Sequence, residues 1–187
     1  SMALAQTADV VVIGGGVTGT SIAFHLARMK AGHVVLLERS HLAAGSTGTS
    51  SGLVRMHYDN PLEAEIALKS FEVFRHFDEF VGGDCGFVQT GFLRTVKPHN
   101  LERLKANVAM LQALGVNTWL VSGDEIHEMA PYLYTEDIPW AAYEPDSGYA
   151  DAHLTTMGFA NAARRHGARV YQGTEVTGFD LNGDRLR

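Results

Sequence analysis

The sequence predicts an α/β fold that opens with a parallel sheet, and three segments near the N-terminus support this prediction. Residues 9–13 (DVVVI) form a β-branched apolar run that ends in three glycines, which is typical of a buried parallel strand. Residues 17–30 place apolar side chains at helical spacing, and residues 33–37 form a second apolar run. A strand, a helix and a strand in this order form a right-handed crossover between parallel strands.

The rest of the chain predicts a mixture of helices and strands. Residues 39–58 show no periodicity and are rich in Gly, Ser and Thr, which favours a functional loop. Asn60-Pro61 then predicts the N-cap and first position of one long helix over 61–81. Three more helices are predicted: one over 101–114, one from the capping box Ser122-x-x-Glu125 to before Pro131, and one from the cap Asp151 to 166. The predicted strands lie on both sides of a Thr90-Gly91 turn within 86–96 and over 118–121, 140–144, 169–171 and 175–181.

The C-terminal residues predict a β-hairpin. Asn182-Gly183 is a strong signal for a two-residue hairpin turn, and residues 184–187 supply the returning strand. A chain rarely stops a few residues into a hairpin partner. We therefore expect the chain to be the truncated N-terminal part of a longer protein, with a C-terminal remainder or other subunits as partners.

Composition excludes several classes of function. The 187 residues carry a net charge of −6, which disfavours a nucleic-acid partner. Cys85 is the single cysteine, so the chain forms no internal disulfide. No segment has the pattern of a membrane span or a signal peptide, and the histidines lack the spacing of metal ligands. We expect a cytoplasmic protein with no nucleic acid, no membrane span and no metal.

The first turn carries a phosphate-binding fingerprint, Gly14-x-Gly16-x-x-Gly19, between the predicted strand and helix. Gly14 permits a tight turn, Gly16 lets the backbone approach a diphosphate, and Gly19 lets the helix pack close to the strand. The N–H groups at the start of the helix then face the phosphates. The pattern predicts a Rossmann-like dinucleotide site; the alternative is an ordinary glycine-rich turn followed by a surface glutamate.

Glu38 limits which dinucleotides can bind at this turn. It ends the second strand, where a carboxylate binds the ribose hydroxyls of a dinucleotide. Its charge repels the 2′-phosphate of NADP, although the neighbouring Arg39 can offset part of this repulsion. The residues therefore leave NAD and the ADP half of FAD as candidates. The small-residue loop over 43–52 (AAGSTGTSSG) favours a second contact with a dinucleotide, the alternative being a flexible surface loop.

The fingerprint and this loop together resemble the flavin-dependent amine oxidoreductases, the group of D-amino-acid oxidase, glycine oxidase, sarcosine oxidase and dimethylglycine dehydrogenase. The resemblance is strongest over residues 9–60 and continues more weakly over 151–181. It implies an FAD-binding domain of the glutathione-reductase type over 8–84 and 145–187. Residues 85–144 then begin a mixed α+β substrate domain.

The resemblance also assigns site residues for FAD. Thr49 stands where some relatives carry a histidine that bonds covalently to the flavin, so we expect non-covalent FAD. Val176 matches a strand residue whose backbone meets adenine, although an ordinary strand valine is an equal alternative. The implied cofactor-binding residues are Gly14, Gly16, Val17, Thr18, Gly19, Glu38, Arg39, Gly45, Ser46, Thr47, Ser50, Ser51, Gly52 and Val176.

The resemblance implies that Arg55 binds the carboxylate of the substrate, because an arginine at the matching place does so in sarcosine-oxidase-like enzymes. A planar guanidinium suits this role; the alternative is a surface salt bridge. His57, two residues on, is more simply structural than an acid or base. No catalytic residue is assigned within this chain, and most of them are expected in the C-terminal remainder.

The expected function is oxidation of the C–N bond of a small amino acid or N-methyl amino acid, such as sarcosine, glycine or dimethylglycine, by hydride transfer to flavin. Two alternatives remain open at this point. One is an NAD-dependent dehydrogenase, and the other is a non-catalytic nucleotide-binding subunit of a larger complex.

Overall fold

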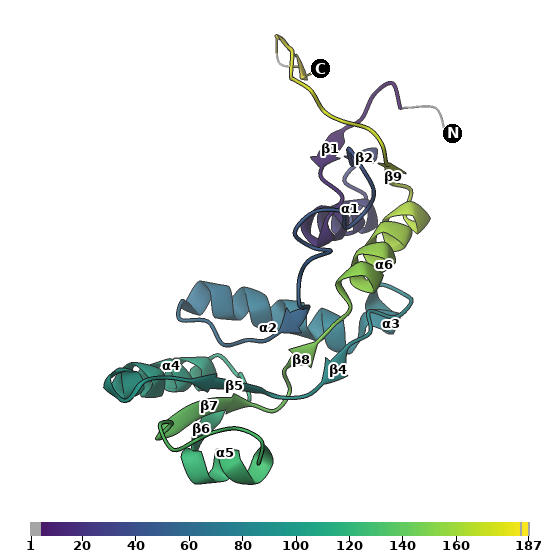
Figure 1. The fold of residues 1–187 in the computed structure, drawn as a ribbon. Coiled ribbons are helices and arrows are strands. Elements are labelled where there is room, and N and C mark those ends of the chain that lie inside the picture. Colours follow the sequence, from purple (N-terminus) through teal and green to yellow (C-terminus); the bar gives the residue numbers. More distant parts are fainter. Residues whose placement is uncertain (1–4, 184, 187) are drawn as a thin grey trace. The chain divides into compact units, whose positions relative to one another are not determined.

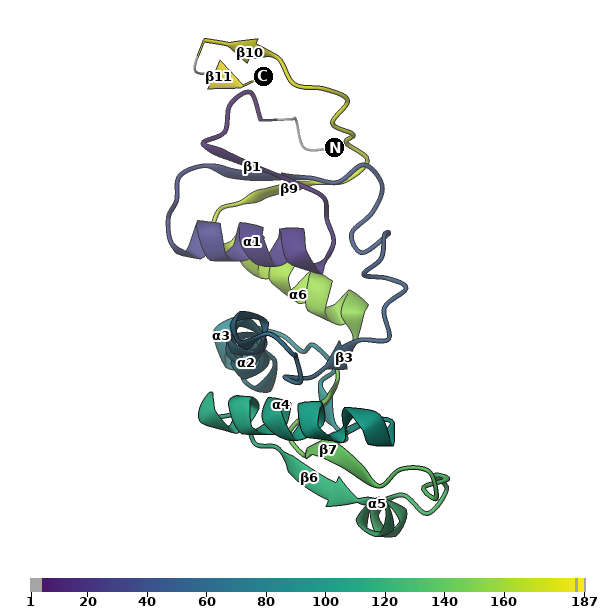
Figure 2. The same ribbon diagram turned by 90° about the vertical axis from the view of Figure 1, so that its left-hand side faces the viewer.

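The computed structural model describes residues 5–183 and 185–186, and the chain divides into two compact units. The first unit contains the described residues up to Ser51, Val81–Cys85 and the described residues from Asp151 onward. The second unit contains Gly52–Phe80 and Gly86–Ala150. Figure 1 labels most of the helices and strands of both, and Figure 2 adds labels for β3, β10 and β11.

The first unit is built on a parallel sheet of three strands, in the order β1-β2-β9. Strand β1 is Val10–Ile13, β2 is Val34–Leu37 and β9 is Arg169–Tyr171. Helix α1, Val17–Arg28, connects β1 to β2, so the predicted strand–helix–strand crossover is confirmed. Helix α6, Ala152–Arg165, precedes β9 and packs beside α1 on the same face of the sheet (Figure 2).

The core of the first unit lies between this sheet and its two helices. Val34, Leu36 and Phe24 are almost fully buried, and the ring of Phe24 lies 5.7 Å from that of Phe159 on α6. The prediction that β1 is buried on both sides is wrong: Val11 is 49% and Ile13 53% exposed. Alternate residues of a strand point to opposite faces, and α1 and α6 cover only one of them.

The second unit contains an antiparallel sheet of three strands, in the order β5-β7-β6. Its strands are β5 (Phe92–Thr95), β7 (Trp140–Glu144) and β6 (Trp119–Ser122). Leu104 and Val108 of α4 (Leu101–Ala113) pack on Ala142, whereas Ile126 of α5 (Gly123–Met129) packs on Ala141. Helices therefore cover both faces of this sheet, as Figure 2 shows, which explains why Ala141 and Ala142 in the middle of β7 are both fully buried.

The remaining elements of the second unit surround a small sheet. Strands β3 (Leu53–Val54) and β4 (Val88–Gln89) both pair with β8 (Gly148–Tyr149). Helix α2 (Pro61–Arg75) contributes Ala64 and Phe71 to a core that also contains Val54 and Met56. A short 3₁₀ turn, Pro98–Asn100, leads into α4.

The local start signals of three helices are confirmed. Ser122 and Glu125 form the reciprocal capping box at the start of α5. The side chain of Asp151 accepts a hydrogen bond from the Leu154 N–H of α6, and that of Asn60 accepts one from the Leu62 N–H of α2. Each cap satisfies a backbone donor that the helix itself cannot pair.

Three predicted elements differ in the structure. The helix over 61–81 is two helices, α2 and α3 (Phe77–Phe80), because His76 leaves helical geometry at φ −121° and ψ 36°. The strand over 175–181 is wrong, since residues 174–180 are irregular. Strands β4 and β5 flank Thr90-Gly91 as predicted, but these two residues form no turn. Their N–H groups both donate to Ser147 O, and β4 pairs with β8 whereas β5 pairs with β7.

The predicted C-terminal hairpin is confirmed. Strands β10 (Leu181–Asn182) and β11 (Arg185–Leu186) pair antiparallel, while Asp184 and Arg187 lie outside the described residues. No described helix is both long and apolar enough to pass through a membrane.

The two compact units group residues 52–80 with 86–150, whereas the expected division was 8–84, 85–144 and 145–187. The difference follows from α2, whose buried residues belong to the core of the second unit. Contacts group residues by packing and not by ligand, so the assignment of cofactor and substrate domains stays a prediction.

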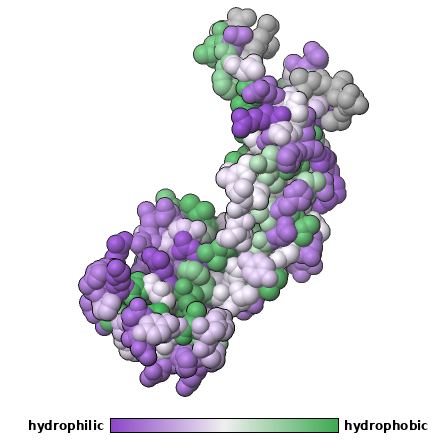
Figure 3. Space-filling view, viewed as in Figure 1, coloured by the Kyte–Doolittle hydropathy of each residue, from purple (hydrophilic) through white to green (hydrophobic). Residues whose placement is uncertain are grey.

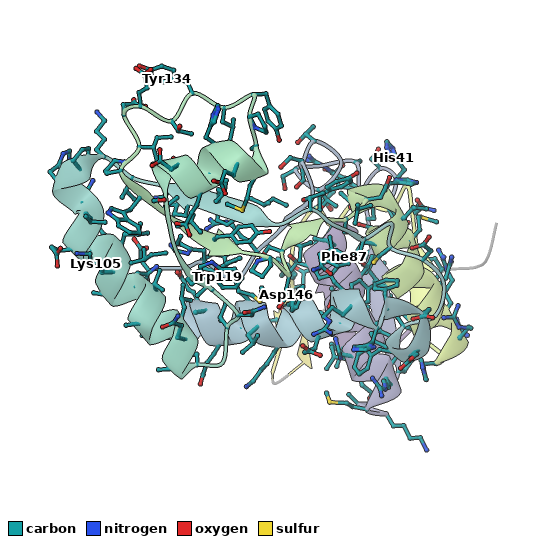
Figure 4. All side chains as sticks on the ribbon, turned by 90° about the horizontal axis from the view of Figure 1, so that it is seen from below. His41, Phe87, Lys105, Trp119, Tyr134 and Asp146 are labelled. Atoms are coloured by element: carbon teal, nitrogen blue, oxygen red, sulfur yellow. The ribbon has the colours of Figure 1, made fainter. Side chains whose placement is uncertain are left out.

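The surface of the second unit is mainly hydrophilic on the face that Figure 3 shows. The loop between α5 and β7 nevertheless carries two exposed aromatic residues, Tyr132 and Tyr134. Tyr134 extends away from the ribbon (Figure 4), and its hydroxyl donates to the Glu136 carboxylate at 2.8 Å.

Candidate functional site

The turn between β1 and α1 needs glycine at several positions. Gly14 has φ +104°, a left-handed conformation that side chains disfavour. A Cβ on Gly19 would lie 1.9 Å from Gly14 O, so the helix can approach the turn only with glycine there. Gly15, which the fingerprint leaves variable, is also closely packed, although against side chains: its Cβ would lie 2.7 Å from Leu42 Cδ2 and 2.9 Å from Glu38 Cβ. Sequence reasoning missed Gly15 because its neighbours are distant in the chain.

The N-terminus of α1 presents uncommitted backbone donors. Gly16 is the N-cap and has no side chain to cap the helix. Instead the Thr47 hydroxyl accepts the Val17 N–H at 3.1 Å. Within the described chain, the N–H groups of Gly16, Thr18 and Gly19 have no acceptor. Three donors at the positive end of a helix dipole fit the diphosphate of a dinucleotide.

Glu38 joins this turn to the one after β2. Its Oε2 accepts the Gly15 N–H at 2.7 Å, and its Oε1 accepts the Ser40 N–H at 2.7 Å. These two backbone donors, Ser40 first, lower the pKa of the Glu38 carboxyl, which is therefore ionised at neutral pH. Each carboxylate oxygen has two lone pairs, so both can still accept a ribose hydroxyl. The sequence predicted the ribose role but missed the structural one.

The lowered pKa of Glu38 predicts a pH effect on stability. A carboxyl whose pKa is lower in the folded state stabilises the fold above its unfolded pKa of about 4.3, and that contribution is lost as pH falls through the folded pKa. Between about pH 5 and pH 3, the melting temperature of the parent protein should fall more steeply than that of Glu38→Gln. Glu65→Gln, on the exposed face of α2, is the control. Parallel curves for parent and Glu38→Gln would contradict this role.

The loop over 43–52 is a series of hydrogen-bonded turns that contacts the β1–α1 turn. The Ala43 N–H donates to Gly15 O, the Gly48 N–H to Gly45 O and the Ser50 N–H to Thr47 O. The Thr49 hydroxyl donates to Ser46 O at 3.1 Å. Because Ala43 and Thr47 both bond to the β1–α1 turn, the structure brings the two predicted halves of the dinucleotide site together.

Among the predicted site residues, Gly52 stands apart from this cluster, whereas Arg39 and Val176 are close in the chain to groups that bond within it. Gly52 belongs to the second unit, where its Cβ would lie 2.0 Å from Ala150 O, so packing alone requires glycine there. Arg39 is exposed beside Glu38. Val176 lies in the irregular segment that follows Thr174, whose N–H donates to Glu38 O at 2.8 Å. Val176 is thus two residues after a residue that bonds to Glu38, the predicted ribose ligand, but it does not lie on a strand.

Arg55 lies in the second unit and is half-buried. Its Nη1 donates to the backbone carbonyl of His57. The guanidinium carbon lies 4.7 Å from the centre of the Tyr58 ring and 5.5 Å from that of Phe92, within range of cation–π attraction. In the part of the chain that the structure describes, no carboxylate pairs with Arg55. The alternative of a surface salt bridge is therefore not observed.

His57 is buried, with 2% of its surface exposed. It lies between Asn107 of α4 and Glu144 of β7. The sequence singled out neither of these partners. Among the residues with described positions, no group of three or more His, Cys, Asp or Glu side chains has the arrangement of a metal site.

Comparison with known proteins identifies relatives along nearly the whole chain. The protein-family model described as FAD dependent oxidoreductase matches residues 9–187. The chain is 30% identical over 177 residues to the mitochondrial pyruvate dehydrogenase phosphatase regulatory subunit of Mus musculus, covering 94% of this chain and 20% of the relative. It is 32% identical over 171 residues to the mitochondrial dimethylglycine dehydrogenase of Rattus norvegicus, covering 91% of this chain and 20% of the relative.

Among solved structures, L-proline dehydrogenase from P. horikoshii matches with a TM-score of 0.90 and 29% identity. The match covers 98% of this chain and 48% of that chain. The present chain therefore spans about a fifth of the length of these curated relatives and about half of this solved structure.

Proposed function

Because this chain belongs to the FAD dependent oxidoreductase family, we propose that it provides the cofactor-binding turn and the substrate carboxylate site of an enzyme that oxidises amino acids. The substrate we propose is a small amino acid or N-methyl amino acid, like sarcosine, glycine or dimethylglycine. Two relatives that are named dehydrogenases of dimethylglycine and of L-proline support this class. The FAD dependence of the family rules out NAD as the expected cofactor.

The residues around the β1–α1 turn fit FAD. The N–H groups of Gly16, Thr18 and Gly19 would bind the diphosphate, and Glu38, with Arg39 beside it, would bind the ribose hydroxyls. The loop residues Gly45, Ser46, Thr47, Ser50 and Ser51 would extend this surface, and the backbone of Val176 would meet adenine. We propose that FAD is held non-covalently, since position 49 carries a threonine whose hydroxyl donates to Ser46 O.

Arg55 carries the proposal for substrate binding. Its guanidinium rests on two aromatic rings, donates to one carbonyl, and pairs with no carboxylate of the described chain. A guanidinium has five N–H donors, so a second edge can bind a carboxylate through two parallel hydrogen bonds. This would fix the amino acid while its nitrogen, deprotonated, and its α-carbon or N-methyl carbon face the cofactor.

The proposed reaction balances as a two-electron oxidation. FAD, when bound, supplies the hydride acceptor. The substrate first gives up its ammonium proton and then loses a hydride from carbon, which leaves an iminium ion. Water then hydrolyses this ion to a carbonyl compound and the ammonium form of the remaining amine. Within this chain, Arg55 orients the substrate and the glycine turn holds the cofactor.

Anaerobic titration of the complete protein with an amine panel tests this function. Sarcosine, glycine, dimethylglycine and proline are compared with the same amines lacking a carboxylate, and bleaching of the flavin absorbance is measured. We expect bleaching by at least one small amino acid and weak or no bleaching by its counterpart without a carboxylate. A flavin that stays oxidised with every amine would contradict the proposal.

A second candidate is a flavin-binding subunit without amine oxidation. The relative named a phosphatase regulatory subunit, at 30% identity, favours this candidate. It predicts a protein that binds FAD but shows no amine-dependent bleaching, so the same titration separates the two.

We also propose a cytoplasmic location, for which the low cysteine content of the sequence is the support.

A further inference from the structure

Glu144 is a fully buried carboxylate that the proposed reaction does not use. It is the last residue of β7 and has 0% of its surface exposed. Its Oε2 accepts the Met56 N–H at 3.1 Å and the Ser147 hydroxyl at 2.8 Å. Its Oε1 has no hydrogen-bond partner and lies 3.5 Å from Nδ1 of His57. Burying a carboxylate destabilises the fold unless polar groups around it compensate. Here these groups are the Met56 N–H, the Ser147 hydroxyl and the His57 ring.

His57 continues this chain of side chains toward α4. Its Nε2 lies 3.0 Å from Nδ2 of Asn107, and both residues are buried. Because the Asn107 amide donates to Nε2, the other ring nitrogen, Nδ1, carries a proton. Nδ1 lies 3.5 Å from Glu144 Oε1, and neither of these two buried atoms has another hydrogen-bond partner. Asn107, His57 and Glu144 thus form a continuous line across the interior of the second unit.

This line ends at the groups that hold Arg55. Glu144 binds the backbone of Met56 directly and faces the ring of His57, and the carbonyl of His57 accepts the Arg55 guanidinium. Phe92, one of the two rings under that guanidinium, is the cross-strand partner of Glu144 between β5 and β7. Cross-strand partners place their side chains on the same face of a sheet. Two of the three groups that contact the Arg55 guanidinium, the His57 carbonyl and the Phe92 ring, therefore belong to residues next to the buried carboxylate.

We infer that Glu144, acting through His57, is a positioning residue that fixes the orientation of the Arg55 guanidinium. Glu144 needs no contact with the substrate or the cofactor for this role. By binding the Met56 N–H and lying beside the His57 imidazole, it fixes the residue whose carbonyl accepts from Arg55, so that the opposite edge of the guanidinium keeps one direction. The inference rests on the proposed function in one respect, that Arg55 binds the substrate carboxylate.

Glu144→Gln in the complete protein tests this inference. Glutamine keeps the size of the side chain but replaces one acceptor oxygen with an NH2 donor. This donor would face the N–H group of Met56 or of His57, so one of these groups loses its acceptor. We expect the KM for the amino-acid substrate to rise by about 3- to 10-fold, as for the loss of one hydrogen bond, with little change in kcat. Flavin content should be unchanged, and so should the KM for the substrate analogue without a carboxylate.

A double-mutant cycle with Arg55→Gln shows whether the effect passes through Arg55. In the Arg55→Gln background, Glu144→Gln should cause no further rise in KM. An equal rise in both backgrounds, or an equal rise for the analogue without a carboxylate, would overturn the inference. A carboxylate preference lost in Arg55→Gln but intact in Glu144→Gln would overturn the inference and leave the proposed function standing. No effect of Arg55→Gln alone would overturn both.

Two further variants separate positioning from folding. Ser147→Ala removes only the hydroxyl that donates to Glu144 Oε2, so it should cause a smaller rise in the same KM even if Glu144→Gln folds poorly. Thr118→Val is the matched control. The buried Thr118 hydroxyl donates to Tyr143 O of β7, the strand that also carries Glu144, but it bonds to neither Glu144 nor Arg55. A KM for Ser147→Ala equal to that of Thr118→Val would also overturn the inference.

Discussion

Replacing Gly16 with valine is expected to remove flavin from the purified protein without unfolding it. A Cβ at this position would lie 2.9 Å from Thr47 Oγ1, and the valine methyl groups would occupy the space in front of the N–H groups of Gly16 and Thr18. A hydrogen bond to a charged group contributes about 1.5–3 kcal/mol, so losing two of them lowers the affinity for FAD by about 100-fold or more. The measurement is flavin absorbance per polypeptide, with circular dichroism as the check on folding.

Gly178→Val is the control for this experiment. Gly178 lies in the irregular segment of the same unit, has an ordinary φ, and has no atom within 4 Å of a Cβ built on it. The control variant should retain flavin at the parent level. A Gly16→Val protein with parent flavin content would show that the diphosphate does not bind at this turn.

Replacing Arg55 with glutamine is expected to weaken the binding of amino-acid substrates while FAD remains bound. The loss of a charge-assisted hydrogen bond of about 1.5–3 kcal/mol predicts a rise in KM of about 10- to 150-fold. The substrate analogue without a carboxylate should show little change, because it makes no such bond. Steady-state kinetics with both substrates measure the difference.

Arg75→Gln is the matched control for Arg55. Arg75 lies on α2 of the same unit, is half exposed, and pairs with Glu72 at 3.6 Å. Exposed pairs of this kind contribute little, so its removal should leave KM unchanged. Arg55→Gln kinetics that match those of Arg75→Gln would remove Arg55 from the substrate site.

Features whose partners are close in sequence could be predicted from the sequence. The turn at Gly14 and the caps at Ser122 and Asp151 depend on residues within a few positions, so residue type alone identifies them. The parallel pairing of β1 with β2 follows from the helix between them.

Features with distant partners could not be predicted. Glu144 bonds to the Met56 N–H, 88 residues away in the chain, and nothing in its local pattern marks it as buried. Ser147 O accepts the N–H groups of both Thr90 and Gly91, far from it in the chain, and residues 174–180 are irregular although Leu181 begins β10. The fingerprint also gave no indication that Glu38 ties Gly15 to Ser40.

A crystal structure of the complete protein with FAD would test the central claim most directly. We expect oxygens of the diphosphate within hydrogen-bond distance, about 2.7–3.2 Å, of the backbone nitrogens of Gly16 and Thr18, with a ribose hydroxyl on the Glu38 carboxylate. A diphosphate bound elsewhere, with these N–H groups facing only solvent or side chains, would contradict the account.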